Sequence, residues 1–280
     1  RKLAHGSIKD MRCTFKHLSN FCLTHTEVNE IWELNLSQYI QFINYLKDKH
    51  QKTKTINKML SQIRSLINYV WQQEKVDRNV LNGFHLKEDE ITQDFESISI
   101  DEAKALISAF GETTPLERRN RTVLLVLYGC GLRTSELINL TMPSLRIETQ
   151  ELLVMGKGSK ERLLPLSDKV FSELIKYLQD RKGKSGPLFK THHKKTKMSV
   201  SYVGNIIKLA AKRVHLEKMI TPKTLRHAFA SHLLNAGVDI ATVSVLMGHR
   251  SPRETGVYIH AEKSNLESAI FKMQEEITHD

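Results

Sequence analysis

The sequence predicts a mainly α-helical protein with a small antiparallel β-hairpin, organised as two domains. Three observations lead to this prediction. The first third carries apolar residues at helical spacing and shows no strand pattern. Two short apolar runs, 151–155 and 162–166, flank a glycine-containing turn in the second part. The length of 280 residues leaves room for about two domains of roughly 150 residues each.

The N-terminal region is expected to form a helical domain over residues 1–88. Ser7 and Ser37 could cap the first two helices, and Thr55 could start the third. Basic residues lie on the polar sides of these helices, which suits contact with the DNA backbone. A plain bundle with a solvated charged face explains this region equally well.

The helical spacing fades after Asn79, so we expect a linker at 89–98 and a second, mixed α+β domain at 99–280. Its expected elements follow in chain order. They are a helix from Asp101 to Phe110, a buried helix from Asn120 to Tyr128, the hairpin, helices Ser199–Val214 and Thr224–Ala236, a short helix from Asp239 stopped by Gly248, a helix from Pro252 to His260, and a C-terminal helix at 265–277.

The composition is that of a folded protein with a polyanionic partner. Charged residues make up 26% and hydrophobic residues 40%, which excludes a disordered chain. Lys and Arg number 42 against 31 Asp and Glu, a net charge of +11 that favours nucleic acid. Taken alone, this charge fits a merely basic soluble protein as well.

The chain shows no apolar run near the roughly 18 residues that a membrane span needs, and no signal peptide is recognisable. Its three cysteines, Cys13, Cys22 and Cys130, are odd in number and widely spaced, which argues against disulfides and zinc. We therefore expect a cytoplasmic protein whose cysteines pack in the core.

Four segments of the second domain carry residues suited to phosphodiester chemistry. Its transition state gathers negative charge on the non-bridging oxygens, and arginine offsets that charge with two parallel hydrogen bonds. The segments are Gly131–Leu137 with Arg133, the hairpin tip Gly156–Arg162 with Lys157, Thr221–His227 with Lys223 and Arg226, and Leu246–His260 with His249 and Tyr258. Each alone has an ordinary explanation in packing or solvation. Their order, with His249 nine residues before Tyr258, favours a shared site.

In this combination the chain resembles the tyrosine recombinase (phage integrase) family, especially its compact Xer-like and integron-like members. The resemblance covers about residues 7–275 and is strongest in GLRTSEL, GKGSKERLLPL and TPKTLRHAFASHLLNAGVDIATVSVLMGH, followed by Tyr258. It implies a DNA core-binding domain at 1–88 and a catalytic domain at 99–280. It also implies a site-specific recombinase that uses no cofactor, metal or ATP.

Carried over by position, the resemblance implies a catalytic set of six residues: Arg133, Lys157, Lys223, Arg226, His249 and Tyr258. Tyr258 would attack the phosphate and form a 3′-phosphotyrosyl link. The two arginines would clamp the non-bridging oxygens, and Lys157 would protonate the leaving oxygen. His249 and Lys223 would complete the phosphate cage.

Three further residues have supporting roles in this interpretation. Glu136 would orient a neighbouring cation, although a helix-surface salt bridge explains it too, and Lys160 and Arg162 would contact DNA. Two features depart from the family pattern. Lys223 stands where His is commonest, and the segment 250–256 before Tyr258 is more basic than usual and contains proline. The acceptor of the Tyr258 proton is not assigned.

The resemblance implies double-stranded DNA with specific recombination sites as the partner, and accessory DNA-bending proteins as further partners. A tetramer on DNA is expected, held through the C-terminal helix. The biological role stays open among integration, excision and resolution of a mobile element or a chromosome dimer. Two alternatives were weighed. A type IB topoisomerase fits the compact N-terminal domain poorly, and a helix-turn-helix regulator explains the charge but not the hairpin lysine.

Overall fold

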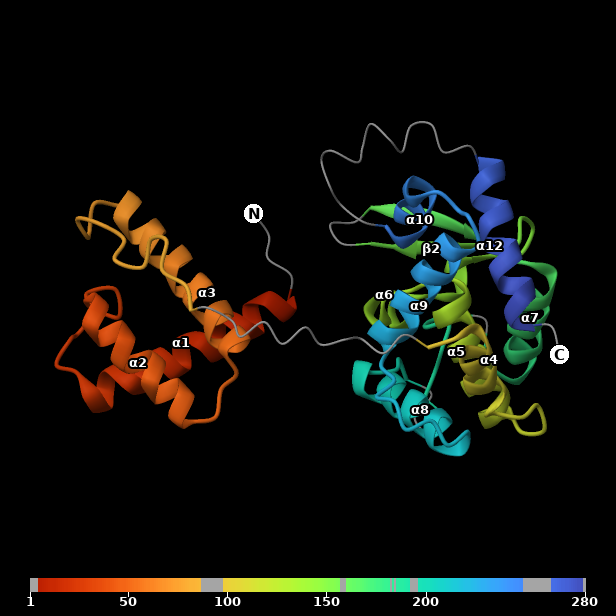
Figure 1. The fold of residues 1–280 in the computed structure, drawn as a ribbon, viewed down its shortest axis with the longest axis horizontal. Coiled ribbons are helices and arrows are strands. Elements are labelled where there is room, and N and C mark those ends of the chain that lie inside the picture. Colours follow the sequence, from red (N-terminus) through yellow and green to blue (C-terminus); the bar gives the residue numbers. More distant parts are fainter. Residues whose placement is uncertain are drawn as a thin grey trace. The chain divides into compact units, whose positions relative to one another are not determined.

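The computed structural model describes residues 5–86, 98–156, 160–181, 183, 185–191, 196–248 and 263–278. The chain divides into two compact units, Arg1–Gln93 and Asp94–Asp280, and each is described by itself (Figure 1). The predicted fold class is confirmed, since both units are mainly helical and the second holds one small antiparallel sheet. The predicted linker 89–98 lies outside the described residues except for Ile98, which is buried in the second unit.

The first unit is built from three helices around an apolar core. They are α1 (His5–His25), α2 (Leu36–Asp48) and α3 (Thr53–Gln72). The core takes apolar side chains from every helix, among them Phe21, Tyr39, Phe42 and Leu60. These residues recur at steps of three and four, which is why one face of each helix is buried.

The helix starts in this unit differ from those predicted. Ser7 lies inside α1 and Ser37 inside α2. The cap of α2 is Asn35, whose side chain accepts a hydrogen bond from the Gln38 backbone N–H at 3.0 Å, while Gln38 bonds back to the Asn35 N–H at 2.9 Å. Such a reciprocal pair satisfies two helix N–H groups. The prediction missed it because it took the nearest serine as the cap.

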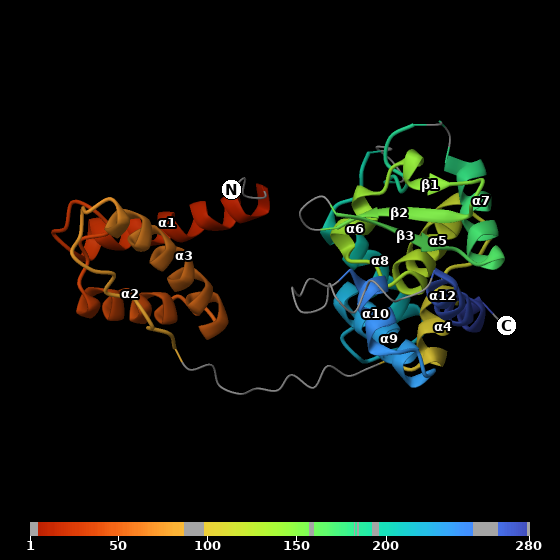
Figure 2. The same ribbon diagram turned by 90° about the horizontal axis from the view of Figure 1, so that it is seen from above.

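The second unit places helices around a three-stranded antiparallel sheet of order β1-β2-β3 (Figure 2). Its elements are α4 (Ile100–Ser108), α5 (Pro115–Gly129), α6 (Thr134–Asn139), a 3-10 turn (Met142–Ser144), β1 (Leu145–Arg146), β2 (Glu151–Met155), β3 (Glu161–Pro165), α7 (Asp168–Arg181), α8 (Val200–Arg213), α9 (Pro222–Asn235), α10 (Ile240–Met247) and α12 (Lys263–Thr278). Among the described residues no helix is long and apolar enough to cross a membrane.

The predicted helix from Pro252 to His260 lies outside the described residues. Most of the other predicted elements of the second unit are confirmed, with three differences. The cap of α4 is Ser99, which pairs reciprocally with Glu102, and not Asp101. The short strand β1 and the helix α7 were not predicted. Val170, Leu174 and Tyr177 of α7 are buried at steps of four and three, so its helical pattern was present in the sequence.

Helix α5 forms the centre of the second unit, and its residues are buried without a break from Thr122 to Gly129. Helices α4, α7, α9 and α12 pack around it. The chain leaves α5 through Gly131, which has a φ of +56°. A Cβ atom there would lie 2.3 Å from a ring carbon of Phe229 on α9. The turn after α5 therefore needs glycine, both for its backbone conformation and for the close approach of α9.

The C-terminal helix α12 packs on its own unit, against β3, α4 and α7 (Figure 2). Ile270 and Met273 are buried there, as is the polar side chain of Gln274. The Gln274 amide accepts a hydrogen bond from the Ser167 N–H at 2.6 Å and donates one to the Gly129 carbonyl at 3.2 Å. The apolar face of the predicted C-terminal helix, with Ile270, Met273 and Ile277, is thus part of the core of its own unit. The opposite face of the helix, with Ser268, Lys272 and Glu275, is exposed.

Replacing Gly131 with alanine should destabilise the second unit by about 2–4 kcal/mol, because it combines a left-handed backbone with overpacking against Phe229. Chemical denaturation of the purified variant measures this change. Gly204 in α8 is the matched control, since a Cβ atom there meets nothing within 4 Å. Gly204→Ala should stabilise the protein by about 0.5–1 kcal/mol. Equal effects of the two substitutions would contradict this explanation.

Candidate active site

The described part of the predicted site is an arginine cluster, which we define as Arg133, Arg162 and Arg226 around the carboxylate of Glu136. The four side chains come from three elements far apart in the sequence. Arg133 is the N-cap of α6 and Glu136 lies in its first turn, Arg162 lies on β3, and Arg226 lies early in α9. Packing of the second unit therefore brings together three of the four segments singled out in the sequence, and the described start of the fourth, at Met247 and Gly248, contacts them.

Glu136 is the centre of the cluster, and its side chain is only 4% exposed. One carboxylate oxygen accepts hydrogen bonds from Arg133 Nη1 at 2.8 Å and Arg162 Nη1 at 3.1 Å. The other accepts from Arg162 Nη2 at 2.9 Å and the Arg133 backbone N–H at 2.9 Å. Arg226 Nη1 lies 3.6 Å from this second oxygen. Glu136 is therefore a buried shared counterion and not one half of a surface salt bridge.

Arg226 is held by backbone carbonyls as well as by charge. Its Nη1 donates to the Gly131 carbonyl at 2.6 Å, and its Nη2 donates to the Met247 carbonyl. Burial lowers the pKa of Arg226 to about 10, as do the nearby positive charges of Arg133 and Arg162, while Glu136 opposes the shift. The guanidinium thus stays protonated at neutral pH, and its orientation is fixed before any ligand arrives.

Arg133 is the more exposed member of the cluster, with 39% of its side chain accessible. It makes long contacts to the carbonyls of Met247, at 3.4 Å, and Gly248, at 3.5 Å. Within the cluster three guanidiniums face one carboxylate, so positive charge is in excess. A phosphate group, whose oxygens match the planar fork of arginine, would offset this excess.

The turn after α10 is fixed against the arginine cluster. Gly248 ends the helix in a left-handed conformation with a φ of +58°, as predicted. A Cβ atom there would lie 2.9 Å from Arg162 Nη1. The backbone of this turn therefore packs closely against the Arg162 guanidinium. His249 is the next residue in the chain, so the turn determines the position at which the following segment starts.

Three residues of the predicted set, Lys157, His249 and Tyr258, lie outside the described residues. Lys223 is exposed in the first turn of α9, one turn before Arg226. Burial lowers the pKa of the neighbouring His227, and the positive charges of Lys223 and Arg226 lower it further. Lys223 and Arg226 thus both lie close enough to His227 to affect its charge.

Lys160 and Arg162, the two hairpin residues predicted to contact DNA, differ in exposure. Lys160 is exposed, and its carbonyl accepts a hydrogen bond from the Gly156 N–H at 2.7 Å, which closes the turn. Arg162, in contrast, has only 12% of its side chain accessible, and both of its terminal nitrogens are held by Glu136. The difference arises because Lys160 lies in the turn before β3, whereas Arg162 lies within the strand and reaches Glu136 of α6.

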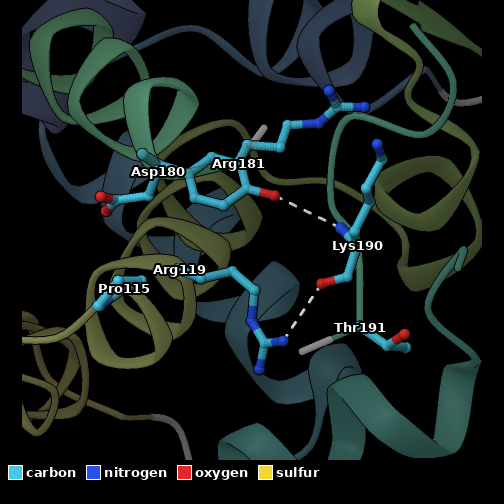
Figure 3. Close-up of a pocket in the computed structure, with 7 residues that line it drawn as sticks. Pro115, Arg119, Asp180, Arg181, Lys190 and Thr191 are labelled. Atoms are coloured by element: carbon cyan, nitrogen blue, oxygen red, sulfur yellow. Dashed lines mark hydrogen bonds between the residues drawn. The ribbon is translucent and has the colours of Figure 1, made fainter. Parts of the chain in front are cut away.

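A small pocket away from the arginine cluster also contains arginines (Figure 3). Arg119 donates to the Lys190 carbonyl at 3.2 Å, and the Tyr177 hydroxyl accepts from the Lys190 N–H at 3.4 Å. These polar groups hold the segment 187–191 against α5 and α7, which is a structural role. Within the described ranges, no group of His, Cys, Asp and Glu side chains is placed to hold a metal ion.

Comparison with known proteins identifies the family. Residues 96–265 match the phage integrase family, and residues 1–74 match the phage integrase N-terminal SAM-like domain. A tyrosine recombinase XerC from Natranaerobius thermophilus is 30% identical over 278 residues, which cover 95% of this chain and 91% of the relative. A tyrosine recombinase XerA from Pyrococcus horikoshii is 32% identical over 83% of this chain and 78% of the relative.

The chain therefore belongs to the phage integrase family and is a tyrosine-type site-specific recombinase, an enzyme that cuts and rejoins DNA. Solved structures agree on the fold. The Tn1549 transposon integrase in complex with transposon right end DNA has a TM-score of 0.74 and 19% identity, over 97% of this chain and 95% of that chain. XerH bound to a palindromic difH substrate has a TM-score of 0.70 and 19% identity, over 94% of this chain and 78% of that chain.

Removing the shared counterion should weaken the fold strongly. Glu136→Ala leaves the three arginines of the cluster facing one another, and breaking a buried ion pair in this way costs about 3–5 kcal/mol. Urea denaturation measures the loss. Asp180→Ala is the matched control, because it removes the carboxylate from the less buried pair of Asp180 with Arg118, at a cost of about 1 kcal/mol. A smaller loss at Glu136 than at Asp180 would contradict the central role of Glu136.

The contribution of Glu136 should also depend on pH. Burial raises its pKa, but the hydrogen bonds and charge of Arg162 and Arg133 outweigh burial, and the pKa ends below the ordinary 4.5. A carboxylate whose pKa is lowered by folding stabilises the fold fully when the pH is above the ordinary pKa. This stabilisation is lost as the pH falls through the lowered pKa. The stability difference between wild type and Glu136→Gln should therefore be largest above pH 4.5 and shrink in more acidic buffer.

Proposed function

We propose that the arginine cluster binds the phosphate to be cut in double-stranded DNA, and that Tyr258 cuts the strand through a 3′-phosphotyrosyl intermediate. One observation supports this most directly. Arg133 and Arg226 are oriented by Glu136 and by backbone carbonyls, and the cluster carries positive charge in excess. Donors that are oriented in advance stabilise the charge that develops in a transition state without having to reorganise.

The proposed reaction has two matching steps. The Tyr258 hydroxyl oxygen attacks the phosphorus, the bond from phosphorus to the 5′ oxygen breaks, and Lys157 gives a proton to the leaving oxygen. The 5′-hydroxyl of another strand then attacks the phosphotyrosine and restores Tyr258. The bonds formed and broken are of one kind, so neither ATP nor a redox cofactor is needed, and Arg133 and Arg226 provide the charge that a metal could otherwise supply.

The remaining residues complete the proposed site. His249 and Lys223 add hydrogen bonds to the phosphate, and Lys160 contacts the DNA backbone beside it. The ammonium group of a lysine offers three N–H donors that suit phosphate oxygens. Lys223, which replaces the histidine common in the family, therefore serves as a donor to the phosphate. The acceptor of the Tyr258 proton stays unassigned.

The partner we propose is double-stranded DNA with specific recombination sites, bound by a core-binding domain at 1–88 and a catalytic domain at 99–280 that are joined by a linker. The net charge of +11 supports a polyanionic partner. The solved Tn1549 integrase and XerH are both complexes with DNA. We further propose a cytoplasmic, nucleoid-associated enzyme that works with accessory DNA-bending proteins. Its role is integration, excision or resolution of a mobile element or a chromosome dimer.

Tyr258→Phe should abolish covalent capture of DNA. The test uses a suicide substrate, in which a nick next to the cleavage site lets the cut strand diffuse away, and detects the protein–DNA adduct on a denaturing gel. Wild type should accumulate the adduct and Tyr258→Phe should not. Tyr69→Phe is the matched control, because Tyr69 is a 61% exposed tyrosine of α3 and should trap like wild type. Absence of a wild-type adduct, or an adduct with Tyr258→Phe, contradicts the proposed function.

Synapsis should bring four chains together on two recombination sites. In the described part of the chain α12 packs on its own unit through its buried face, and we propose that this helix also contributes the contact between subunits. Light scattering of the complex with two full sites gives the number of chains, with four expected. A complex that never exceeds two chains would contradict the tetramer.

A further inference from the structure

We propose that Arg162 is a positioning residue of the recombination site and does not contact DNA. It holds the Glu136 carboxylate and the turn at Gly248, and so determines how Arg133 and Arg226 are presented to the phosphate. This inference rests on the proposed function, because it concerns the binding of the phosphate at the same site.

Arg162 differs from Arg226 in the group that holds it and not in burial, since the two side chains are 12% and 9% exposed. Its Nη1 and Nη2 each donate to a different oxygen of Glu136, at 3.1 and 2.9 Å, a two-pronged pairing that only the planar guanidinium can make. Its Nε is buried and has no hydrogen-bond partner among the described residues. The side chain as a whole is 12% exposed. Arg226 is held instead by the carbonyls of Gly131 and Met247, so the pairing with both oxygens of Glu136 is what sets Arg162 apart.

Arg162 also connects segments that the fold brings together from different parts of the chain. On β3 it lies opposite Val154 of β2, near the end of the hairpin whose tip carries Lys157. Its guanidinium packs against Gly248, where a Cβ atom would come within 2.9 Å. Through Glu136 it is linked to α6. One side chain thus joins the hairpin, the turn before His249 and the helix that follows Arg133.

Charge explains why this third arginine matters. A carboxylate next to Arg133 and Arg226 would normally compete with a phosphate for their hydrogen bonds. Because Arg162 engages both oxygens of Glu136, the carboxylate is partly neutralised and kept in one orientation. Arg226 then lies 3.6 Å from Glu136, beyond a good hydrogen bond, and its charge stays available to an anion. Without Arg162, Glu136 would keep only its hydrogen bonds to Arg133, and we expect it to turn toward Arg226 and offset that charge.

The test compares Arg162→Met and Arg162→Lys with wild type in two measurements. The first is the single-turnover rate of covalent capture on the suicide substrate at saturating protein. The second is the salt dependence of DNA affinity. Loss of a charge-assisted hydrogen-bond pair that supports the transition state should slow capture roughly 10- to 100-fold. Lysine keeps the charge but cannot reach both oxygens, so Arg162→Lys should be slowed in the same range. Neither variant should change the salt dependence.

Two comparison variants distinguish the positioning role of Arg162 from an ion pair outside the site and from a direct phosphate contact. Arg118 also pairs with both oxygens of a carboxylate, that of Asp180, but it lies outside the arginine cluster. Arg118→Met should therefore keep the wild-type capture rate. Lys160→Met removes a proposed phosphate contact, which should reduce the slope of log affinity against log salt by about 0.9. A residue that supports the arginine cluster without touching DNA should slow capture and leave that slope unchanged.

A double variant tests whether Arg162 acts through Glu136. If it does, Arg162→Met should slow capture much less in a Glu136→Gln background than in wild type, because the orientation of Glu136 is already lost. A merely structural role predicts that the two effects multiply. Thermal melting of each variant establishes that folded protein is compared.

Wild-type capture rates for both Arg162 variants would overturn the proposal, as would a salt slope for Arg162→Met that falls as it does for Lys160→Met. If Arg162→Met does not fold, Arg162→Lys decides alone, and a wild-type rate for it overturns the proposal. Failure of wild type itself to capture DNA would instead contradict the proposed function, so the two failures are distinguishable.

Discussion

The second unit depends on one buried carboxylate shared by three arginines. Glu136 receives hydrogen bonds from Arg133 and Arg162 and lies close to Arg226, and these three come from α6, β3 and α9. Such an arrangement costs desolvation free energy that hydrophobic packing would avoid. It persists because the surrounding helices hold it, and it leaves positive charge in a fixed place. In a recombinase this is the charge that a DNA phosphate requires.

Two glycines make the cluster geometrically possible. Gly131 lets the chain turn sharply after α5 while the ring of Phe229 presses against its α-carbon. Gly248 lets the turn after α10 lie against the Arg162 guanidinium. Both adopt left-handed backbone conformations that other residues adopt only with strain. Their carbonyls, together with that of Met247, accept hydrogen bonds from the arginines, so the backbone itself contributes to the site.

Much of the fold could be predicted from local patterns. The hairpin strands, the buried helix α5 and the stop at Gly248 follow from alternation, helical spacing and turn residues, which act over a few positions. Two helix starts were misassigned because the reciprocal pairs of Asn35 with Gln38 and Ser99 with Glu102 were overlooked. Those pairs are visible in the sequence, so the error lay in the interpretation and not in missing information.

The sequence by itself determined the residue types of the site, their order and the family to which the chain belongs. Only the tertiary structure decided which of them face one another. Arg162 and Lys160 lie two residues apart on one hairpin, yet one is buried against Glu136 and the other is exposed. The tertiary structure also showed that α12 packs on its own unit, where the Gln274 side chain is hydrogen-bonded. The physical reason is that burial and charge pairing depend on segments distant in the chain, which no local pattern records.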